Sequence, residues 1–212
     1  MNIEKALTLL NNNQLEELKH YLTLELLATK NKKQANIVKT IEKYIKNIDE
    51  HRPTFKAIQH DETNHQYIID GYTAYYFNEY NKDLDILPQN NDKLLDIHNI
   101  IKLKGDYQEL TPNDTLTLNN IKNYIKYYKA ETKDKNVVVP FGNRYINANY
   151  LKTLLDIFAT TDNITYITPP EKHNPVYLTN GKITAIILPL RLTEMQQIDE
   201  IYNNFKETLK NV

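Results

Sequence analysis

The stretch Asn174–Leu192, NPVYLTNGKITAIILPLRL, decides the fold because it contains two strands joined by a tight turn. Residues 176–179 and 183–188 are rich in β-branched and apolar side chains, which favours strands. Between them, Asn180-Gly181 is typical of a type I′ hairpin turn, since both residues tolerate a positive φ. The second strand ends on Pro189 between two leucines, and a proline there predicts a protected sheet edge.

The rest of the chain alternates helical and strand patterns around this hairpin. Apolar residues recur every three or four positions, as in amphipathic helices, in Ile3–Leu10, Leu15–Leu26, Ile37–Ile48, Asp92–Leu103, Tyr150–Phe158 and Met195–Leu209. Further strands are expected at Thr54–Gln59, at Gln66–Phe77 with a bend or hairpin turn at Asp70-Gly71, at Val137–Val139 and at Asn163–Thr168. This order predicts an α+β fold with an antiparallel sheet.

The segment Thr115–Ala130 is compatible with two structures. As strands, TLTL and IKNYIKYYKAE form a hairpin that turns at Asn119-Asn120, and the many threonine and tyrosine residues favour this interpretation. As a helix, the same part of the chain places four lysines along one face: Lys122, Lys126, Lys129 and Lys133. We expect the hairpin, because the sheet needs strands in this part of the chain.

The composition excludes several classes of function. The 212-residue chain has no cysteine and no serine, which removes disulfides, thiolate zinc sites and serine or cysteine nucleophiles. Its four glycines are too widely spaced to form a glycine-rich phosphate loop. With 26 basic and 27 acidic residues, the chain is not a strongly basic nucleic-acid binder, although a local basic face is compatible with this balance.

No acid, base and nucleophile come together in the sequence, so we expect a protein that is not an enzyme and needs no cofactor. His60 and His65 bracket two carboxylates in an expected turn, but no third ligand converges on them, so no metal site is expected. No apolar run approaches 18 residues, so we expect no transmembrane helix and no membrane partner. A cytoplasmic location fits this composition.

The segment from Asn143 to Leu192 resembles the end of a bacterial sliding clamp, the ring-shaped processivity factor of replicative DNA polymerase. In that family a helix of the form Tyr-Leu-x-x-x-Leu precedes three strands, and the last strand closes on an apolar-Pro-apolar-Arg-Leu tail. Here RYINANYLKTLLDIF supplies the helix, ITYITPPEKHNPVYL the middle strands and ILPLRL the tail. Arg52-Pro53 and Asp70-Gly71 look like the family's Arg-Pro…Asp-Gly region, so the resemblance extends loosely over residues 34–192.

The resemblance implies a peptide-binding pocket beside the tail, because the family's tail borders a hydrophobic pocket that accepts short peptides from polymerases and other partners. The candidate pocket residues are Leu188, Pro189, Leu190, Arg191 and Leu192. The simpler alternative is that the leucines continue the core-facing alternation of the strand. In the family this pocket lies between two neighbouring domains, so a single copy would not complete it.

The chain departs from the family pattern in three ways. Family chains carry three such domains and dimerise into a ring, whereas this chain has material for about one. Tyr72-Thr73 follow Asp70-Gly71 where the family has His-Arg, which puts the pocket chemistry in doubt. The helix after Leu192 is extra, and it is expected to cover the pocket, contact the N-terminal helices or mediate assembly.

The resemblance also implies a DNA-binding face, because clamp helices line the central hole and contact duplex phosphates through lysine and arginine. One narrow face of the expected 32–48 helix, opposite its isoleucines, carries Lys32, Lys39, Lys43 and Lys46. The alternative is that these lysines are the solvated face of an amphipathic helix. The helix that ends at Phe158 adds only Lys152, with Asp156 nearby, so the expected lining is lopsided.

Three parts are expected: an N-terminal helical extension (1–31), one clamp-like α+β domain with an antiparallel sheet and two packing helices (32–192), and a C-terminal amphipathic helix (193–212). The expected function is that of a non-enzymatic, replication-associated, clamp-like homo-oligomer that binds duplex DNA or replication proteins such as polymerase. The alternative is a clamp-mimicking protein-interaction module, of phage or mobile-element origin, that engages host replication proteins without encircling DNA.

Overall fold

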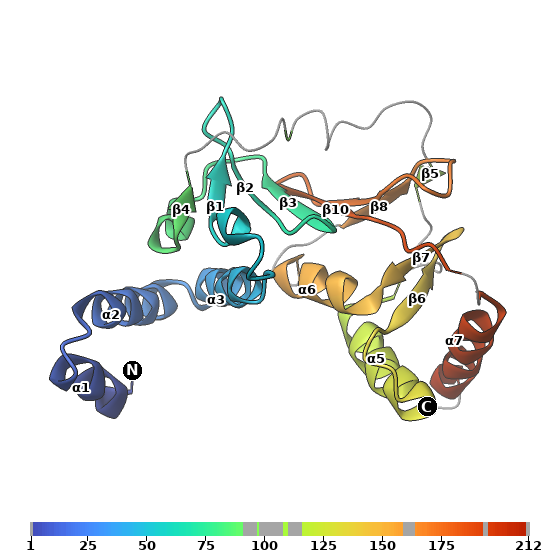
Figure 1. Cartoon of the computed structure of the whole chain (residues 1–212), viewed down its shortest axis with the longest axis horizontal. Helices are drawn as coiled ribbons and strands as arrows, with labels where there is room; N and C mark the ends of the chain where they lie inside the picture. The colour runs from blue at the N-terminus through green and yellow to red at the C-terminus, as the bar shows by residue number, and fades with distance from the viewer. Residues whose placement is uncertain are drawn as a thin grey trace.

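A unit of one helix followed by three antiparallel strands occurs twice in the chain (Figure 1). The structure, a computed structural model, describes residues 2–90, 97, 108–109, 116–158, 164–192 and 195–210. The first unit consists of α3 (Lys32–Lys46), β1 (Ile58–His60), β2 (Gln66–Ile69) and β3 (Thr73–Phe77). The second unit consists of α6 (Ala148–Phe158), β8 (Thr165–Thr168), β9 (Val176–Thr179) and β10 (Ile183–Ile187).

Both units contribute to one sheet, whose order within the described residues is β4-β1-β2-β3-β10-β9-β8-β5. Its edge strands are β4 (Gln89–Asn90) and β5 (Gln108–Glu109). The α+β class is confirmed, but the sheet is mixed rather than wholly antiparallel, because β1 and β4 run parallel. This pair is parallel because the chain after β3 loops back through the 3-10 helix η2 (Lys82–Ile86) and returns beside β1 in the same direction.

The two units are related by a local twofold axis between β3 and β10, the central strands. These strands pair antiparallel, with Thr73 opposite Ile187. Hydrogen bonds close the pair at both ends in the same way. The Leu188 N–H donates to the Tyr72 carbonyl at 2.9 Å, and the Asn78 N–H donates to the Lys182 carbonyl at 2.8 Å.

The two expected hairpins occupy equivalent places in the two units, each joining the second strand to the third. Asp70 Oδ1 accepts from the N–H groups of residues 72 and 73, and Asn180 Oδ1 accepts from those of residues 182 and 183. Gly71 and Gly181 have φ values of +92° and +83°. The type I′ prediction is wrong, because Asn180 does not have a positive φ and the turn depends on Gly181 alone.

Replacing Gly71 with alanine is expected to destabilise the protein more than replacing Gly181. Both substitutions force a side chain into a positive φ, at a cost of about 1–2 kcal/mol. At Gly71 the new Cβ also meets the Arg52 guanidinium, which donates to the Asp70 carbonyl, whereas the space around Gly181 is open. Losing that hydrogen bond adds roughly 1 kcal/mol. Urea unfolding of the two variants measures the difference, and equal losses would contradict it.

The main core lies between the sheet and the pair α3 and α6, which pack side by side on one face (Figure 1). α3 buries one side through Ile37, Ile41, Tyr44 and Ile45, at the spacing expected from the sequence. α6 buries its apolar side through Leu151, Leu154, Leu155 and Phe158. These helices therefore hold their polar sides away from the sheet, which is what places the groove described below.

The hairpin expected within Thr115–Ala130 is wrong, since residues 118–132 form the helix α5 (Leu118–Thr132). Thr117 caps this helix by accepting from the N–H of residue 120 at 3.2 Å. The residues buried along it follow helical spacing: Ile121, Tyr124, Ile125 and Tyr128. Burial of these tyrosines outweighs their intrinsic preference for strands.

A small two-stranded sheet and the C-terminal helix cover α5. The strands are β6 (Val138–Phe141) and β7 (Arg144–Asn147), and the helix is α7 (Met195–Lys210). Phe205 of α7 is buried, and its ring centroid lies 5.3 Å from that of Tyr124. Within the described residues this helix packs against α5 and β6, which was not among the expected outcomes, and its start borders the groove of the tail residues.

The N-terminal helices α1 (Ile3–Asn11) and α2 (Leu15–Lys30) project from the body as an arm (Figure 1). α2 is anchored through Leu24, which joins the main core, and through His20, which bonds to the Ile86 carbonyl at 3.1 Å. The helix expected at 92–103 lies outside the described residues apart from Ile97. None of the helices within the described ranges has the length and apolar character needed to span a membrane.

Candidate functional site

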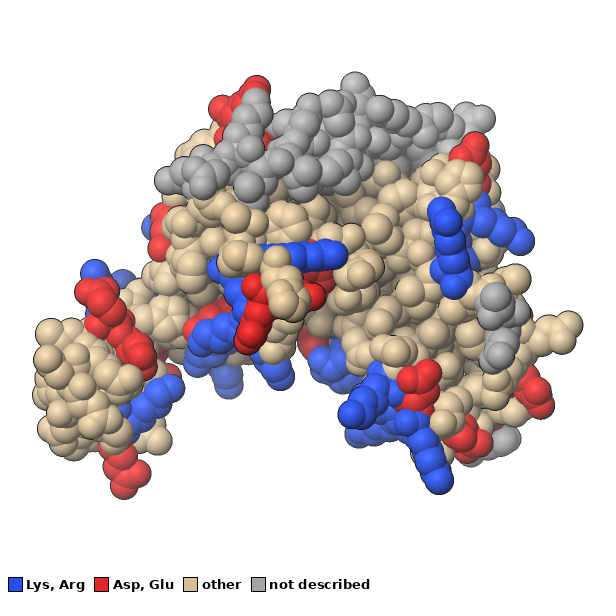
Figure 2. Space-filling view, viewed as in Figure 1, with Lys and Arg blue, Asp and Glu red and all other residues tan. Residues whose placement is uncertain are grey.

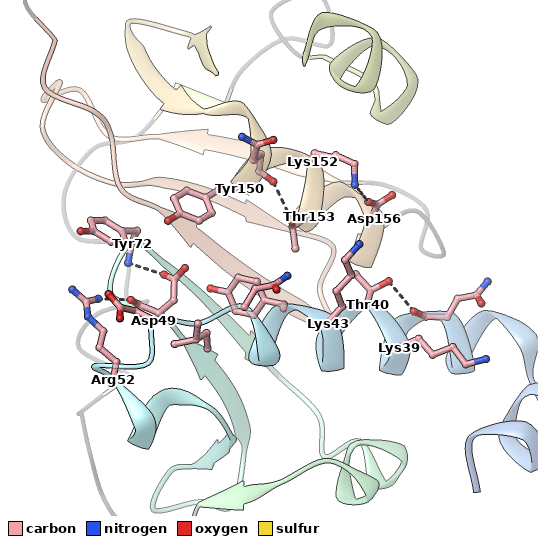
Figure 3. A pocket seen from close by; sticks show the side chains of 16 residues that line it. Lys39, Thr40, Lys43, Asp49, Arg52, Tyr72, Tyr150, Lys152, Thr153 and Asp156 are labelled. Atoms are coloured by element: carbon pink, nitrogen blue, oxygen red, sulfur yellow. Dashed lines mark hydrogen bonds and ion pairs between the residues drawn. The ribbon is translucent and has the colours of Figure 1, made fainter. Parts of the chain in front are cut away.

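A groove of about 940 Å³ runs along the seam between α3 and α6 (Figure 3). Both helices line it with lysines, short polar side chains and one tyrosine each. α3 contributes Asn36, Lys39, Thr40, Lys43 and Tyr44, and α6 contributes Asn149, Tyr150, Lys152, Thr153 and Asp156. The groove exists because each helix buries its apolar side against the sheet and leaves its polar side at the seam.

One carboxylate at the groove connects two helices, α6 and α5. Asp156 pairs with Lys152 of its own helix at 2.5 Å and with Lys122 of α5 at 2.9 Å. Burial alone would raise the pKa of the Asp156 carboxyl, but the hydrogen bonds and charges of the two lysines hold that pKa below its usual value. The carboxylate therefore stays charged at neutral pH, and it fixes α5 beside the groove.

The other lysines around the groove are not neutralised in this way. Lys43 of α3 and Lys126 and Lys129 of α5 have no ion pair among the residues that the structure describes. Lys39 is only loosely paired, with its Nζ 4.0 Å from a Glu25 carboxylate oxygen. Figure 2 shows basic side chains gathered along the underside of the molecule, below the helices and on both sides of a hollow.

The four lysines expected to bind DNA are all exposed, but the structure separates them. Lys39 and Lys43 line the groove. Lys46 faces the α2 side instead and bonds to Glu42 at 2.6 Å. Lys32, at the start of α3, does not line the groove. The lining from α6 is lopsided as expected, since Lys152 is the lysine that α6 contributes to it. The α5 lysines follow the helical spacing noted as the alternative for that segment and lie beside the groove, where Lys122 pairs with Asp156.

One end of the groove holds an aromatic and cationic cluster that sequence reasoning missed. The Tyr72 ring stacks near that of Tyr150, with centroids 6.2 Å apart and planes at 18°. The Arg52 Cζ lies 5.4 Å from the Tyr72 centroid, a cation–π contact. Burial, chiefly, raises the pKa of the Tyr150 hydroxyl to about 12, so it stays protonated. The available signal in the sequence was Tyr72-Thr73 at the place where the clamp pattern has His-Arg. In the structure the Tyr72 side chain is 53% exposed.

The five tail residues line a second groove, of about 680 Å³. Its other walls are the β6–β7 hairpin and the start of α7, including Tyr145 and Met195. Core-facing alternation stops at Ile187, because Leu188 is 42% exposed. The tail therefore borders a groove formed within one chain, with the start of α7 as one of its walls.

Arg144 organises the loop that borders this second groove. Its guanidinium is buried, with 2% of the residue exposed, and it donates to three backbone carbonyls. These belong to Pro169, to Glu171 at 2.5 Å and to Asn174 at 3.0 Å. Burial lowers the pKa of this guanidinium from its ordinary value, but an arginine remains charged at any physiological pH.

The described part of the chain contains no group of three or more histidine, aspartate or glutamate side chains that would hold a metal ion. His60 and His65 each bond to neighbouring side chains instead. His60 contacts Gln89 at 2.8 Å, and His65 lies 3.6 Å from Asp61.

No protein-family model, no curated protein and no solved structure matches the chain.

Proposed function

We propose that this chain is a non-enzymatic, clamp-like protein that holds duplex DNA against the face formed by α3, α5 and α6. The observation that carries the proposal is that lysines without a close ion pair, among the described residues, come from α3 and from α5 beside one groove. Lys39 and Lys43 of α3 line the groove, and Lys126 and Lys129 continue the face of α5 that carries Lys122, the partner of the groove residue Asp156. Flexible cationic side chains without aligned hydrogen-bond acceptors suit phosphate contacts, which do not depend on base sequence.

The fold supports this assignment in a second way. The sheet lies on one side of the molecule and the lysine-bearing helices on the other (Figures 1 and 2). The resemblance to sliding clamps implies the same division, with helices facing DNA and sheets facing outward. The twice-repeated unit of a helix and three strands agrees with the family's pattern around its tail. One such domain does not enclose a duplex, so encirclement would require several copies.

Duplex binding is expected to weaken steeply with salt. Four phosphate contacts release their counterions with a slope of about −0.9 each, so log K against log[salt] should fall with a slope near −3.6. Fluorescence anisotropy of a labelled duplex of random sequence, titrated with the full chain at several salt concentrations, measures the slope. A second duplex of unrelated sequence serves as the control, and it should bind equally well.

Two outcomes would contradict the proposal. The first is no measurable duplex binding at low salt, where lysine–phosphate contacts are strongest. The second is a slope near −1, which would mean that the lysine face does not contact the backbone as a unit. A strong preference between the two duplexes would instead indicate base reading, for which the groove shows no arrangement of aligned donors and acceptors.

The tail groove favours a second candidate function, that of a clamp-mimicking interaction module. Leu188, Leu190 and Leu192 line a partly apolar groove beside the cationic Lys172 and Arg191. Such a groove fits a short peptide with apolar and acidic residues, by analogy with the peptides that the clamp family accepts. If the chain does not bind duplex DNA, the interaction module becomes the favoured function. Capture of replication proteins by the wild-type chain, but not by a Leu190→Glu variant, would then test it.

A further inference from the structure

The arm formed by α1 and α2 carries apolar side chains that the described residues do not cover. The exposed ones are Ile3, Leu7, Leu10, Leu15, Leu22 and Leu26. α1 has no buried residue, and Leu24 is the buried residue of α2. Figure 2 shows the visible face of the arm as a broad uncharged area with charged side chains at its edges.

Physical chemistry argues against leaving this surface in water. A nine-residue helix such as α1 is marginal in water unless an apolar face packs against something. Six side chains of this size, each about half exposed, present on the order of 600 Å² of apolar surface, the upper end of what a monomer normally shows. The arm therefore has the properties of an interface rather than of a solvated extension.

The spacing of the leucines along α2 indicates that a second copy of the same helix covers this apolar surface. Leu15, Leu18, Leu22 and Leu26 surround a hollow of about 360 Å³ on the surface of the helix. The stripe has nearly the same spacing in either direction, so an antiparallel α2 of a second copy would place Leu15 against Leu26 and Leu18 against Leu22. Such reciprocal pairing is what a twofold interface requires, and leucine side chains of one helix fill hollows of the other.

We infer that the chain self-associates through antiparallel α2 helices of two copies, with α1 flanking the contact. Two arms pressed together would bury about 1,200 Å², the lower limit for a specific interface between proteins. The inference rests on the arm alone and is independent of the proposed DNA-binding function. No residue of α1 or α2 lines the lysine groove, although Glu25 of α2 lies 4.0 Å from Lys39, so the inferred contact does not use the residues that line the groove.

Light scattering of the full chain at micromolar concentration should give twice the monomer mass of 25.0 kDa. A Leu22→Glu/Leu26→Glu variant should fall to the monomer mass, because the dimer would bury four carboxylates against Leu15 and Leu18 of the two copies with no cationic partner. Lys30→Glu is the matched control, since it changes the net charge equally at an exposed position that does not line the hollow, and it should remain dimeric. A monomeric wild type, or a dimeric double variant, would overturn the inference.

Both leucines are exposed, so the double variant should fold, and circular dichroism melting checks this. Cross-linking provides a second measurement that needs no disruption of the interface, because the chain has no cysteine of its own. Leu15→Cys/Leu26→Cys should form intermolecular disulfides under mild oxidation, whereas Leu15→Cys alone should not. Equal cross-linking of both variants would indicate parallel helices and would exclude the antiparallel arrangement.

Discussion

Duplex DNA is expected to bind about 10³-fold more weakly, at 0.1 M salt, to a variant in which Lys39, Lys43, Lys126 and Lys129 are all glutamine. Each lysine that contacts a phosphate contributes the release of one counterion, and four such contributions multiply. The residual salt slope should fall to about −0.9, because Lys122 and Lys152 are already paired with Asp156 and Lys133 is the further lysine on that face of α5.

The matched control replaces four lysines that lie neither on α3 nor on α5 and do not line the groove: Lys82, Lys172, Lys182 and Lys210. This variant undergoes the same change in net charge, so any effect of overall charge on binding is shared. It should keep most of the affinity and nearly all of the salt slope. If both variants lose affinity equally, binding is a general property of the chain's charge, and the groove between α3 and α6 is not the DNA site.

Replacing Arg144 with methionine is expected to lower the free energy of unfolding by about 3–5 kcal/mol. The substitution removes the donor of the carbonyls of residues 169 and 174 and one of the two donors of the Glu171 carbonyl, and each unsatisfied buried acceptor costs roughly 1–3 kcal/mol. Methionine keeps much of the side-chain volume, so the loss reports on hydrogen bonds rather than on a cavity. Urea denaturation of the two proteins, with unchanged m-values, measures it.

Arg191 supplies the control for this measurement, because it lines the same groove but is exposed. Arg191→Met should change the free energy of unfolding by no more than about 0.5 kcal/mol. A similar small effect for Arg144→Met would show that water replaces the guanidinium at the three carbonyls. In that case the loop between β8 and β9 would not depend on Arg144 for its conformation.

Local signals predicted the hairpins and most helices of this fold. Asp70-Gly71 and Asn180-Gly181 each interrupt a β-rich run, and both become turns between the second and third strand of a unit. The error at α5 arose because tyrosine is typical of strands, while the lysines at positions 122, 126 and 129 carried the helical spacing. The parallel pairing of β1 with β4 depends on a return through η2, which no local pattern indicates.

The candidate site was only partly predictable, for a physical reason. The lysine face of α3 can be predicted from the sequence of that helix alone, because it lies opposite a single apolar stripe. The groove needs α6 as well, and the lysines beside it come from α5; both helices begin more than 80 residues later in the chain. Tyr72 becomes a groove residue through Arg52 and Tyr150, and neither contact follows from spacing. The tail residues did assemble into a groove, with α7 as a wall that the family pattern lacks.

The pairing of β3 with β10 has a consequence for the synthesis of the chain. β3 ends at Phe77 and its partner β10 begins at Ile183, so β3 leaves the ribosome 106 positions before the strand that pairs with it at the centre of the sheet. At about 5–20 residues per second, that edge waits roughly 5–20 s for its partner. Every residue of β3 is buried in the finished sheet, so the nascent chain exposes an apolar strand with unpaired backbone groups throughout this interval. Its yield in a cell should therefore depend on chaperones that bind such strands during translation.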